Sequence, residues 1–549
     1  SVEISGTIDA SGMEAGQSAG QIKAIGAETH VKDGAALLAR GQVDGGLIET
    51  SGDYLDVADA ANIDTSAATG KMGTWLLDPT EVIIASRDSD AYKNAKNKVD
   101  IDKDASTYTR DTSVISTESL VNRLKTNNVT IEAIDLANHM ADITLASALN
   151  VDTTKEGGST LTLLADNDII IDAAIHANSP LNIVLKGDND NNGNGDGKGG
   201  VHINADIYTG GGYFETGANS ATYFSAAQDI LSSSNAPISR TIDTNGGNVN
   251  IQNEALLQLN GGTLNINTKG GHVTFAKNIT SMNNYVAFMD FDYASYLDEM
   301  RKGNTSATKT KQAEAWENLL REIYGKTYIN DMGKEVVFEA KGVDSKTVAF
   351  DELSYAQKSE ISTELAQVWE VANMTASIGN PNDDKLGKNI NHSHLVTITD
   401  QYENTAAMAN AVKIGNNTVE YFTGGKDVTD PPTNGGAGRT FSWVVGPEAG
   451  NGFYKTTGTG TGNAVNGSYT NWVHGVTHWG GTYEEPNNGD GKIRQPYVAV
   501  GWTDKNGWDD VQNHQGQTVH GFIRETELPN SAGNGFYKTT GTGTGNAVK

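Results

Sequence analysis

The sequence predicts a mainly β protein: a right-handed parallel β-helix over residues 1–280, a helical connector over 281–350, and an α+β domain over 351–530. Three observations lead to this prediction. Residues 1–280 consist of short segments in which apolar and polar residues alternate, separated by Gly, Asn and Asp. Helix-forming residues concentrate between 281 and 380. Short strand-like segments return from 385 to 527, together with most of the eight Trp residues.

The alternating segments predict the β-helix. Each places Val, Ile or Leu at every second position, as in NVTIEA (Asn128–Ala133), STLTLLADNDIIIDA (Ser159–Ala173) and LNIVLKG (Leu181–Gly187). A short strand cannot bury its apolar face alone, whereas stacked coils bury a continuous inner column. A β-helix is therefore the most economical interpretation. An array of β-sandwiches is the alternative, although sandwiches usually have longer strands and more aromatic residues.

Helical periodicity marks the region that follows. In TKTKQAEAWENLLREIYG, the residues Ala315, Leu319 and Ile323 recur at helical spacing. A second long helix is predicted over Ser354–Ala376, with Ser354 or Asp351 as its N-cap.

Composition limits the partners of the chain. Lys and Arg number 40 against 68 Asp and Glu, which gives a net charge of −28. Nucleic acids and anionic membranes require a basic surface, so neither is expected as a partner. The absence of Cys excludes disulfides and thiolate metal sites, and no apolar run is long enough for a membrane-spanning helix. The chain opens directly on strand-like sequence without a visible signal peptide, so we expect a mature or trimmed chain.

The N-terminal part resembles a family of secreted adhesins. GGLIETSGDYLDV (Gly45–Val57), followed by GTWLLDPTEVII (Gly73–Ile84), resembles the filamentous-haemagglutinin-like adhesins that are exported by two-partner secretion. The resemblance covers residues 1–280 and implies a β-helical stalk on the bacterial cell surface. The family's N-terminal secretion domain has no counterpart here. Within the motif, Trp75, Leu76 and Leu77 are expected to be core residues of a coil and not a binding site.

The C-terminal part resembles bacterial C-type-lectin-like domains. Trp369 would lie on the first helix of that fold, residues 402–411 on the second, and HGFIRE (His520–Glu525) in the closing strand. Five motifs occur in the family's order: HSHLVTITDQYEN (His392–Asn404), FSWVVGPEAG (Phe441–Gly450), YTNWVHG (Tyr469–Gly475), EEPNNGD (Glu484–Asp490) and GWDDVQ (Gly507–Gln512).

This second resemblance implies a Ca²⁺ site. The family combines an E-P-N element, with a cis proline, and a W-N-D element, whose side-chain oxygens surround the ion while sugar hydroxyls displace its water. Here the elements read EPN and WDD. The implied metal ligands are Glu485, Asn487, Asp490, Asp509 and Asp510, and a glycan would bind through Glu485, Asn487 and Asp509.

Two departures from the family pattern bear on that site. The acidic residue usually found just before the central strand is missing, with Gln495 and Pro496 in that region, which makes Asp490 a candidate substitute. The supporting disulfides are also missing. The structural alternatives are a capped loop for Glu485 and Asn487, and core packing for the Trp residues, which we favour for Trp472 and Trp508.

Weaker signals favour structural roles. GDNDNNGNGDGKGG (Gly187–Gly200) begins like an EF-type calcium loop but lacks the closing Glu, so a protruding turn is the better interpretation. His392 and His394 are too few ligands for a metal site. No nucleophile elbow, zinc-protease motif or phosphate-binding loop occurs, and we expect no enzyme activity. A carbohydrate-active β-helix lyase or hydrolase is the alternative. Such enzymes need clustered carboxylates or basic residues in a groove, whereas the Asp residues here lie mostly in turn contexts.

The segment AGNGFYKTTGTGTGNAV occurs twice, at 449–465 and within a C-terminal tail at 531–549. A second copy could add to a neighbouring subunit as a strand and produce a head-to-tail filament. The uncapped first coil supports the same hypothesis, because an open coil end is a template for stacking. The alternatives are a recent gene duplication that left a flexible tail, a trace of a diversified cassette, and an error in the sequence. The candidate assembly residues are Ala532, Gly535, Phe536, Tyr537, Thr540 and Val548.

The sequence therefore leads to three functional hypotheses. The chain is an extracellular adhesin whose head binds a glycan or a cell-surface protein with Ca²⁺, a self-associating filament subunit, or a carbohydrate-active enzyme.

Overall fold

The computed structural model describes residues 1–549 apart from short gaps and two long ones. The residues outside the description are 98–99, 102–107, 110–111, 136–140, 153–157, 190–194, 196, 228–229, 232–235, 290–316, 318–319, 322, 330–334, 366–368, 370–371, 374–375, 377–392, 410, 412, 415–416, 431, 433–434, 479–480, 492–493, 502–506, 513–518, 528–535, 541–543 and 549. The chain divides into two compact units. Unit 1 comprises 1–227, 237–282 and 530–549, and unit 2 comprises 228–236 and 283–529.

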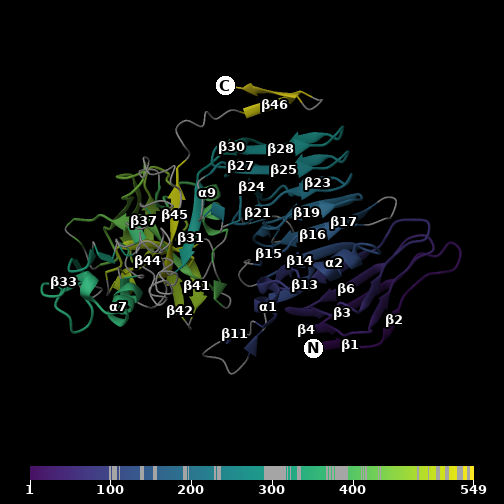
Figure 1. Ribbon diagram of the computed structural model, residues 1–549, viewed down its shortest axis with the longest axis horizontal. Coiled ribbons are helices and arrows are strands. Elements are labelled where there is room, and N and C mark those ends of the chain that lie inside the picture. Colours follow the sequence, from purple (N-terminus) through teal and green to yellow (C-terminus); the bar gives the residue numbers. More distant parts are fainter. Residues whose placement is uncertain are drawn as a thin grey trace. The chain divides into compact units, whose positions relative to one another are not determined.

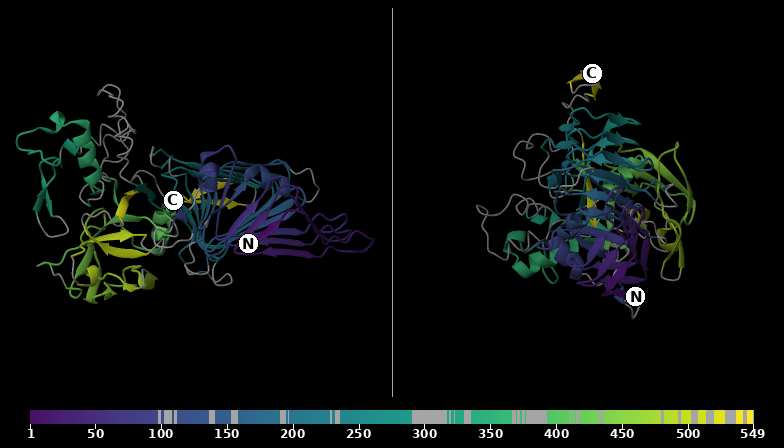
Figure 2. Two further views of the ribbon diagram at one scale, coloured as in Figure 1. Left: turned by 90° about the horizontal axis from the view of Figure 1, so that it is seen from below. Right: turned by 90° about the vertical axis from the view of Figure 1, so that its right-hand side faces the viewer.

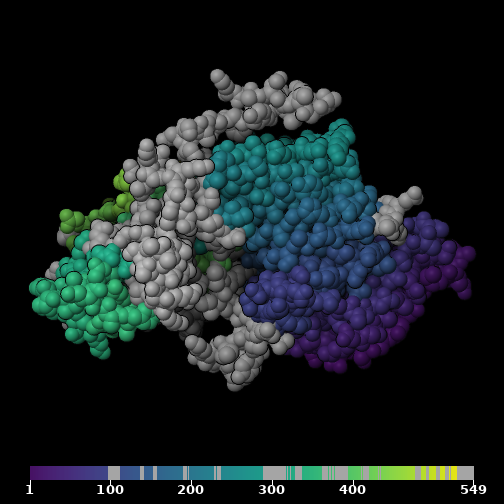
Figure 3. All heavy atoms as spheres, in the orientation of Figure 1, coloured from purple at the N-terminus to yellow at the C-terminus, as the bar shows by residue number. Residues whose placement is uncertain are grey.

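Unit 1 is built from parallel strands that the chain visits in a fixed rotation. From β14 onward, successive strands enter three different sheets in turn, and every third strand pairs in parallel with the strand three earlier. Figure 1 shows these strands side by side along the unit, Figure 2 shows the same stack from two further sides, and Figure 3 shows its coils in contact in sequence order. This arrangement confirms the mainly β class and is compatible with the predicted β-helix.

The largest sheet of unit 1 runs in the order β3 (Gln21–Ile25), β6 (Leu47–Ser51), β9 (Thr74–Asp78), β14 (Asn128–Ala133), β17 (Ser159–Ala165), β20 (Leu181–Lys186), β23 (Phe214–Thr216), β26 (Val249–Ile251) and β29 (Val273–Phe275). A second sheet holds β13 (Thr112–Ser116), β10 (Glu81–Ala85), β15 (Ile143–Leu145), β18 (Ile169–Ile171), β21 (Gly200–Ile203), β24 (Ala221–Phe224), β27 (Ala255–Leu257) and β30 (Ile279–Ser281). A third holds β16 (Leu149–Val151), β19 (Ile175–Ala177), β22 (Ile207–Tyr208), β25 (Ser239–Asp243) and β28 (Thr263–Asn267).

The first coils of unit 1 follow the same rule with two smaller sheets. One contains β1 (Val2–Ile4), β4 (Glu28–Val31) and β7 (Tyr54–Val57), and the other contains β2 (Thr7–Asp9), β5 (Ala36–Leu38) and β8 (Asn62–Asp64). Two helices, α1 (Asp90–Asn97) and α2 (Thr117–Arg123), and the hairpin of β11 (Asp100–Ile101) and β12 (Tyr108–Thr109) interrupt the coils. Helix α2 begins where the Ser116 side chain caps the Ser119 amide at 3.0 Å.

Alternating burial explains why these segments form strands. In β17 the odd-numbered residues are buried and the even-numbered residues are half-buried. The register places Leu163 between Ile131 of β14 and Leu185 of β20, and all three side chains are at most 1% exposed. Each strand thus buries one apolar row against the equivalent rows of its neighbours, which is the stacking that the sequence pattern predicted. The parallel pairing argues against antiparallel sandwiches.

Trp75, Leu76 and Leu77 lie in β9, as expected of a coil. Trp75 and Leu77 are buried, and the Trp75 indole donates a hydrogen bond to the Thr50 hydroxyl at 3.0 Å. Leu76 lies on the half-buried outer face of the strand. The WLLDP element is therefore a packing feature of the coil, which agrees with its predicted structural role.

Unit 2 is an α+β assembly around a mixed sheet. The sheet runs in the order β31 (Asn284–Met289), β45 (Val519–Thr526), β37 (Glu420–Asp427), β38 (Thr440–Trp443), β39 (Gly452–Gly458) and β40 (Thr461–Ala464), with β34 (Ser393–Leu395), β43 (Tyr497–Val500) and β44 (Trp508–Val511) paired off this path. The unit also contains helices α7 (Tyr355–Leu365), α9 (Gln401–Met408) and α10 (Asn488–Gly491), the 3₁₀ helix η2 (Phe350–Glu352), and the hairpins β35 (Lys413–Ile414) with β36 (Asn417–Thr418) and β41 (His474–His478) with β42 (Gly481–Glu484).

The region predicted as a helical connector also contains strands. β31 pairs antiparallel with β45 over six residues, and β32 (Thr327–Ile329) forms a hairpin with β33 (Glu335–Val337). Helical residues are described at Glu317, Leu320 and Ile323. The β31 segment NYVAFM is rich in aromatic and branched residues, and its pairing with a strand more than 200 residues away is a tertiary interaction that local periodicity does not reveal.

None of the helices in the described part of the chain is both long and apolar enough to cross a membrane.

Candidate metal centre

The loop that precedes α10 carries the EPN element. The Glu485 amide donates to the Val473 carbonyl at 2.8 Å, and the Pro486 carbonyl accepts from the Gly460 amide at 3.0 Å. Gly460 forms the turn between β39 and β40, so the hairpin made by the first copy of the repeat holds this loop in place. The Glu485–Pro486 peptide bond is cis, as the resemblance implied.

The WDD element lies on β44, next to that loop. β44 pairs antiparallel with β43, and all four of its residues are buried. Trp508 is fully buried and donates its indole N–H to the Asn404 side-chain oxygen at 2.8 Å, while its ring packs edge-on against Trp443 and Trp472. Core packing is therefore the role of Trp508 and Trp472, as expected. Trp479 and Trp502 lie outside the described residues.

The two elements bring three carboxylates together. One oxygen each of Glu485, Asp509 and Asp510 lies within 4.8 Å of the others, and the residues are 1%, 8% and 0% exposed. Asn487 contacts the same group. Its backbone N–H donates to Glu485 Oε2 at 3.0 Å and to Asp510 Oδ1 at 2.7 Å, and its side-chain Nδ2 donates to Glu485 Oε1 at 2.7 Å. Four of the five predicted metal ligands are thus neighbours.

Asp490, the fifth predicted ligand, lies in the short helix α10, and its side chain is outside the description. The backbone of Gln495 contacts two residues next to the group. The backbone N–H of Gln495 donates to Asn488 Oδ1 at 2.7 Å, and its backbone carbonyl accepts from Arg439. Its side-chain oxygen is buried and has no hydrogen-bond partner among the described residues.

Arg439 is the residue that sequence reasoning missed. Its guanidinium is fully buried and pairs with Asp427 at 3.2 Å and with Asp510, and it lies over the Phe441 ring at 4.6 Å. A lone Arg in a Gly-rich stretch carries no motif, so only the fold reveals this contact. Because Arg439 neutralises Asp510 from one side, the uncompensated charge of the triad belongs to Glu485 and Asp509.

Burial makes these two carboxyls hard to ionise. Burial, followed by the nearby charge of Asp510, raises the pKa of Glu485 to about 9. Burial and then the charges of Glu485 and Glu420 raise the pKa of Asp509 well above its ordinary value. Two buried acids that favour the protonated form create a site where a divalent cation could replace the protons.

The donor chemistry fits a hard cation. Carboxylate and amide oxygens are the ligands that Ca²⁺ prefers, and it requires six to eight of them at about 2.3–2.6 Å. Glu485, Asp509 and Asp510 would supply carboxylate oxygens, and Asn487 and Gln495 would supply amide oxygens. The positive charge would relieve the repulsion that raises the carboxyl pKa values.

The weaker sequence candidates have structural partners. The Asp188 carboxylate accepts the Gly197 amide at 3.0 Å and closes the turn of the EF-like segment. His394 is buried and hydrogen-bonds to Glu527 at 3.0 Å and to the Leu395 carbonyl at 2.8 Å, while His392 lies outside the described residues. In unit 1, burial and then the charges of Glu132, Glu49 and Asp166 raise the pKa of Asp78 to about 7. These four acids lie on or next to neighbouring strands, and clustered carboxylates are what the alternative enzyme hypothesis requires.

The candidate assembly residues fall in the second copy of the repeat. Ala532 and Gly535 lie outside the described residues. Phe536, Tyr537 and Thr540 belong to β46 (Phe536–Thr540), and Val548 belongs to β47 (Thr544–Val548). β46 and β47 form an antiparallel hairpin.

Searches against protein-family models, curated proteins and solved structures find no match for this chain. The resemblances to the adhesin and lectin-like families therefore stay predictions.

Proposed function

We propose that this chain is a secreted bacterial surface adhesin. In this proposal, residues 1–280 form a right-handed parallel β-helical stalk of the filamentous-haemagglutinin-like kind. Unit 2 is a C-type-lectin-like head that binds Ca²⁺ and, through it, a glycan or a cell-surface protein. The stacked parallel strands of unit 1 support the stalk, and the antiparallel pairing of β31 with β45 in an α+β unit supports the head. Catalysis is not part of the proposal.

The observation that carries the proposal is the buried acidic triad. Three carboxylates that converge from one loop and from strand β44, with 1%, 8% and 0% exposure, are costly to a fold unless protons or a cation compensate them. The buried and unpartnered Gln495 side-chain oxygen is a second cost that a metal ligand role would remove. Both features are explained together if this loop and strand β44 bind a hard divalent cation.

Calcium titration of the whole chain tests the proposal. We expect isothermal titration calorimetry of chelator-treated protein to show one Ca²⁺ per chain, with affinity reduced at least about tenfold by Glu485→Gln or Asp509→Asn, because each removes a charged ligand. The matched control is Glu484→Gln, since Glu484 is the preceding residue, is half exposed and pairs with His474. No calcium heat, or equal affinity in Glu485→Gln and Glu484→Gln, would contradict the proposal.

Glycan binding is tested separately. On a glycan array, binding should require Ca²⁺ and should be lost on Asn487→Ala. Calcium binding without any glycan signal would favour a protein ligand.

A second candidate function is a filament subunit, and one observation favours it. The two copies of the repeat share the register of three residue pairs: Tyr454 pairs with Ala464 in β39–β40, and Tyr537 pairs with Ala547 in β46–β47. They differ next to the turn, where Thr461 pairs with Gly458 and its counterpart Thr544 pairs with Thr540. Within the described residues β40 is the edge strand of its sheet, and an edge strand can accept another strand. Negative-stain electron microscopy with and without residues 531–549 tests this candidate. Fibres from the intact chain alone would support it, and single particles from both would contradict it.

A further inference from the structure

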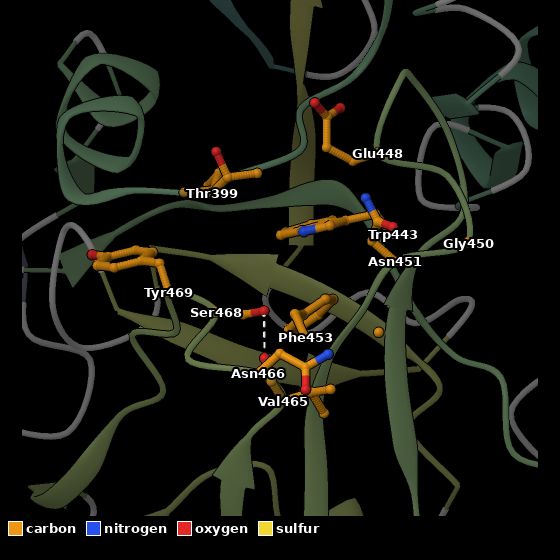
Figure 4. A pocket seen from close by; sticks show the side chains of 12 residues that line it. Thr399, Trp443, Glu448, Gly450, Asn451, Phe453, Val465, Asn466, Ser468 and Tyr469 are labelled. Carbon is orange, nitrogen blue, oxygen red and sulfur yellow. Dashed lines mark hydrogen bonds between the residues drawn. The ribbon is translucent and has the colours of Figure 1, made fainter.

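Unit 2 contains a cavity that the metal centre does not use. Its volume is about 440 Å³, and its lining comes from three segments, 398–399, 443–453 and 465–469 (Figure 4). None of Glu485, Asn487, Asp509 and Asp510 lines it. The volume lies within the range of pockets that hold small molecules.

Three aromatic rings form much of the wall. Trp443 and Phe453 stack on each other with their centroids 4.4 Å apart, and Tyr469 meets the Trp508 ring edge-on at 5.8 Å. Figure 4 shows the Trp443 ring between Phe453 and Glu448, with the Tyr469 ring to one side. Trp443 and Phe453 are 2% exposed, so core packing fixes their orientation before any ligand arrives. Tyr469 is half-buried and presents more of its ring to a ligand, and the negative face of an aromatic ring attracts cations.

Glu448 is the one charged residue in the lining, and its charge is negative. The Thr397 hydroxyl donates to Glu448 Oε2 at 2.8 Å and holds the carboxylate in place. Among the described residues, no Lys, Arg or His forms an ion pair with Glu448, and Oε1 receives no hydrogen bond. Glu448 would therefore repel an anion, whereas a cation could pair with its carboxylate within a cavity that aromatic residues also line.

The remaining polar groups suit a short polar substituent. Asn451, Asn466 and Ser468 line the same cavity. The Ser468 hydroxyl donates to the Val465 carbonyl at 2.7 Å, so its oxygen lone pairs remain as acceptors. An amide and a hydroxyl can bind a ligand hydroxyl next to the charged head.

We propose that this cavity binds a small organic cation, an alkylated ammonium compound. Its ammonium group lies against the Trp443 and Tyr469 rings and is paired with Glu448. Its polar end contacts Asn451, Asn466 or Ser468. The binding does not require Ca²⁺, and the proposal does not depend on the metal centre.

The test uses choline and its uncharged isostere, 3,3-dimethyl-1-butanol, on the whole chain in the presence of a calcium chelator. Ligand-observed NMR titration should give an affinity for choline at least about tenfold tighter than for the isostere, because only choline carries the charge. Glu448→Gln should weaken the affinity for choline at least about fivefold and leave the affinity for the isostere unchanged, because the substitution removes the carboxylate charge. Tyr469→Leu should weaken choline as well. Glu484→Gln, which lies outside the cavity, should match the unmodified chain.

Several outcomes would overturn the proposal. These are equal binding of choline and the isostere, tighter binding of a neutral sugar such as glucose, no binding of either probe, or unchanged choline binding in Glu448→Gln. Because Glu448 is only partly buried, its conservative replacement should leave the melting temperature unchanged, which circular dichroism verifies. A neutral sugar as the preferred ligand would identify the cavity as a glycan subsite instead.

Discussion

The candidate metal centre consists of buried charged side chains, and they differ in whether a positive charge lies beside them. Arg439 shares its single positive charge between Asp427 and Asp510 at full burial, whereas Glu485 and Asp509 have no cation beside them among the described residues. A buried ion pair that loses one partner leaves an uncompensated charge, which is more costly than the pair itself. The protein itself thus supplies a positive charge next to Asp510. The negative charges of Glu485 and Asp509 are compensated by protons or by a cation.

The raised pKa of Glu485 predicts how stability depends on pH. Its pKa rises from the ordinary 4.5 to about 9 in the folded state, so the folded chain holds a proton that the unfolded chain releases. The stabilising contribution of that proton is complete below pH 4.5 and is lost as the pH rises to about 9. The slope approaches about 1.4 kcal/mol per pH unit for one proton.

The comparison that isolates this effect is urea unfolding of calcium-free protein from pH 5 to pH 9. We expect Glu485→Gln to lose less stability over this range than the unmodified chain, because the amide cannot ionise. Glu484→Gln should follow the unmodified chain. Parallel curves for the unmodified chain and Glu485→Gln would show that Glu485 does not carry the proton.

At the scale of elements, unit 1 depends on columns of apolar residues shared by neighbouring strands. Ile131, Leu163 and Leu185 occupy equivalent positions in β14, β17 and β20, and each is at most 1% exposed. A strand of seven residues has too little area to be stable alone, so each coil is stabilised by its neighbours.

Leu163→Ala measures that dependence. We expect the substitution to lower the free energy of unfolding of unit 1 by about 2–5 kcal/mol, because it removes apolar area and leaves a cavity. Thr162→Ala is the matched control, since Thr162 is the adjacent residue of β17 on the half-buried outer face, and it should cost less than about 1 kcal/mol. Denaturant unfolding is the measurement. Equal effects of the two substitutions would mean that position 163 is not in the core.

The sequence predicted these elements to an uneven degree. Period-2 alternation identified the strands around Ser159 and Leu181, because one face of each is buried and the other is not. The same reasoning missed β31, which lies in the expected connector and is completed by β45. Local pattern reports which face of a segment is apolar, and it does not report which distant segment pairs with it.

At the scale of the whole molecule, the two units have separate cores. Unit 2 has an apolar cluster of its own around Trp369, Phe422 and Phe522, whereas unit 1 has its stacked columns. Residues 228–236 lie between two segments of unit 1 in the sequence but belong to unit 2, so the second unit is not one continuous segment. Separate cores permit separate unfolding.

Differential scanning calorimetry of the whole chain should therefore show two transitions. Calcium should raise only the transition of unit 2, by about 2.7 kcal/mol of stability at a concentration one hundred times its Kd, because it binds the folded head alone. Asp509→Asn should abolish the shift and leave the unit 1 transition in place. A single transition, or a calcium shift that persists in Asp509→Asn, would contradict this picture.

The sequence by itself determined the mainly β class, the alternating core of the coils and the set of residues around the EPN and WDD elements. It could do so because strand periodicity and short motifs are local properties of the chain. Only the tertiary structure decided that Arg439 compensates Asp510, that Gln495 presents an unpartnered oxygen, and that Trp443, Phe453, Tyr469 and Glu448 enclose one cavity. These contacts join residues far apart in the chain, and burial sets their energies, because charge and ring interactions strengthen where water is excluded.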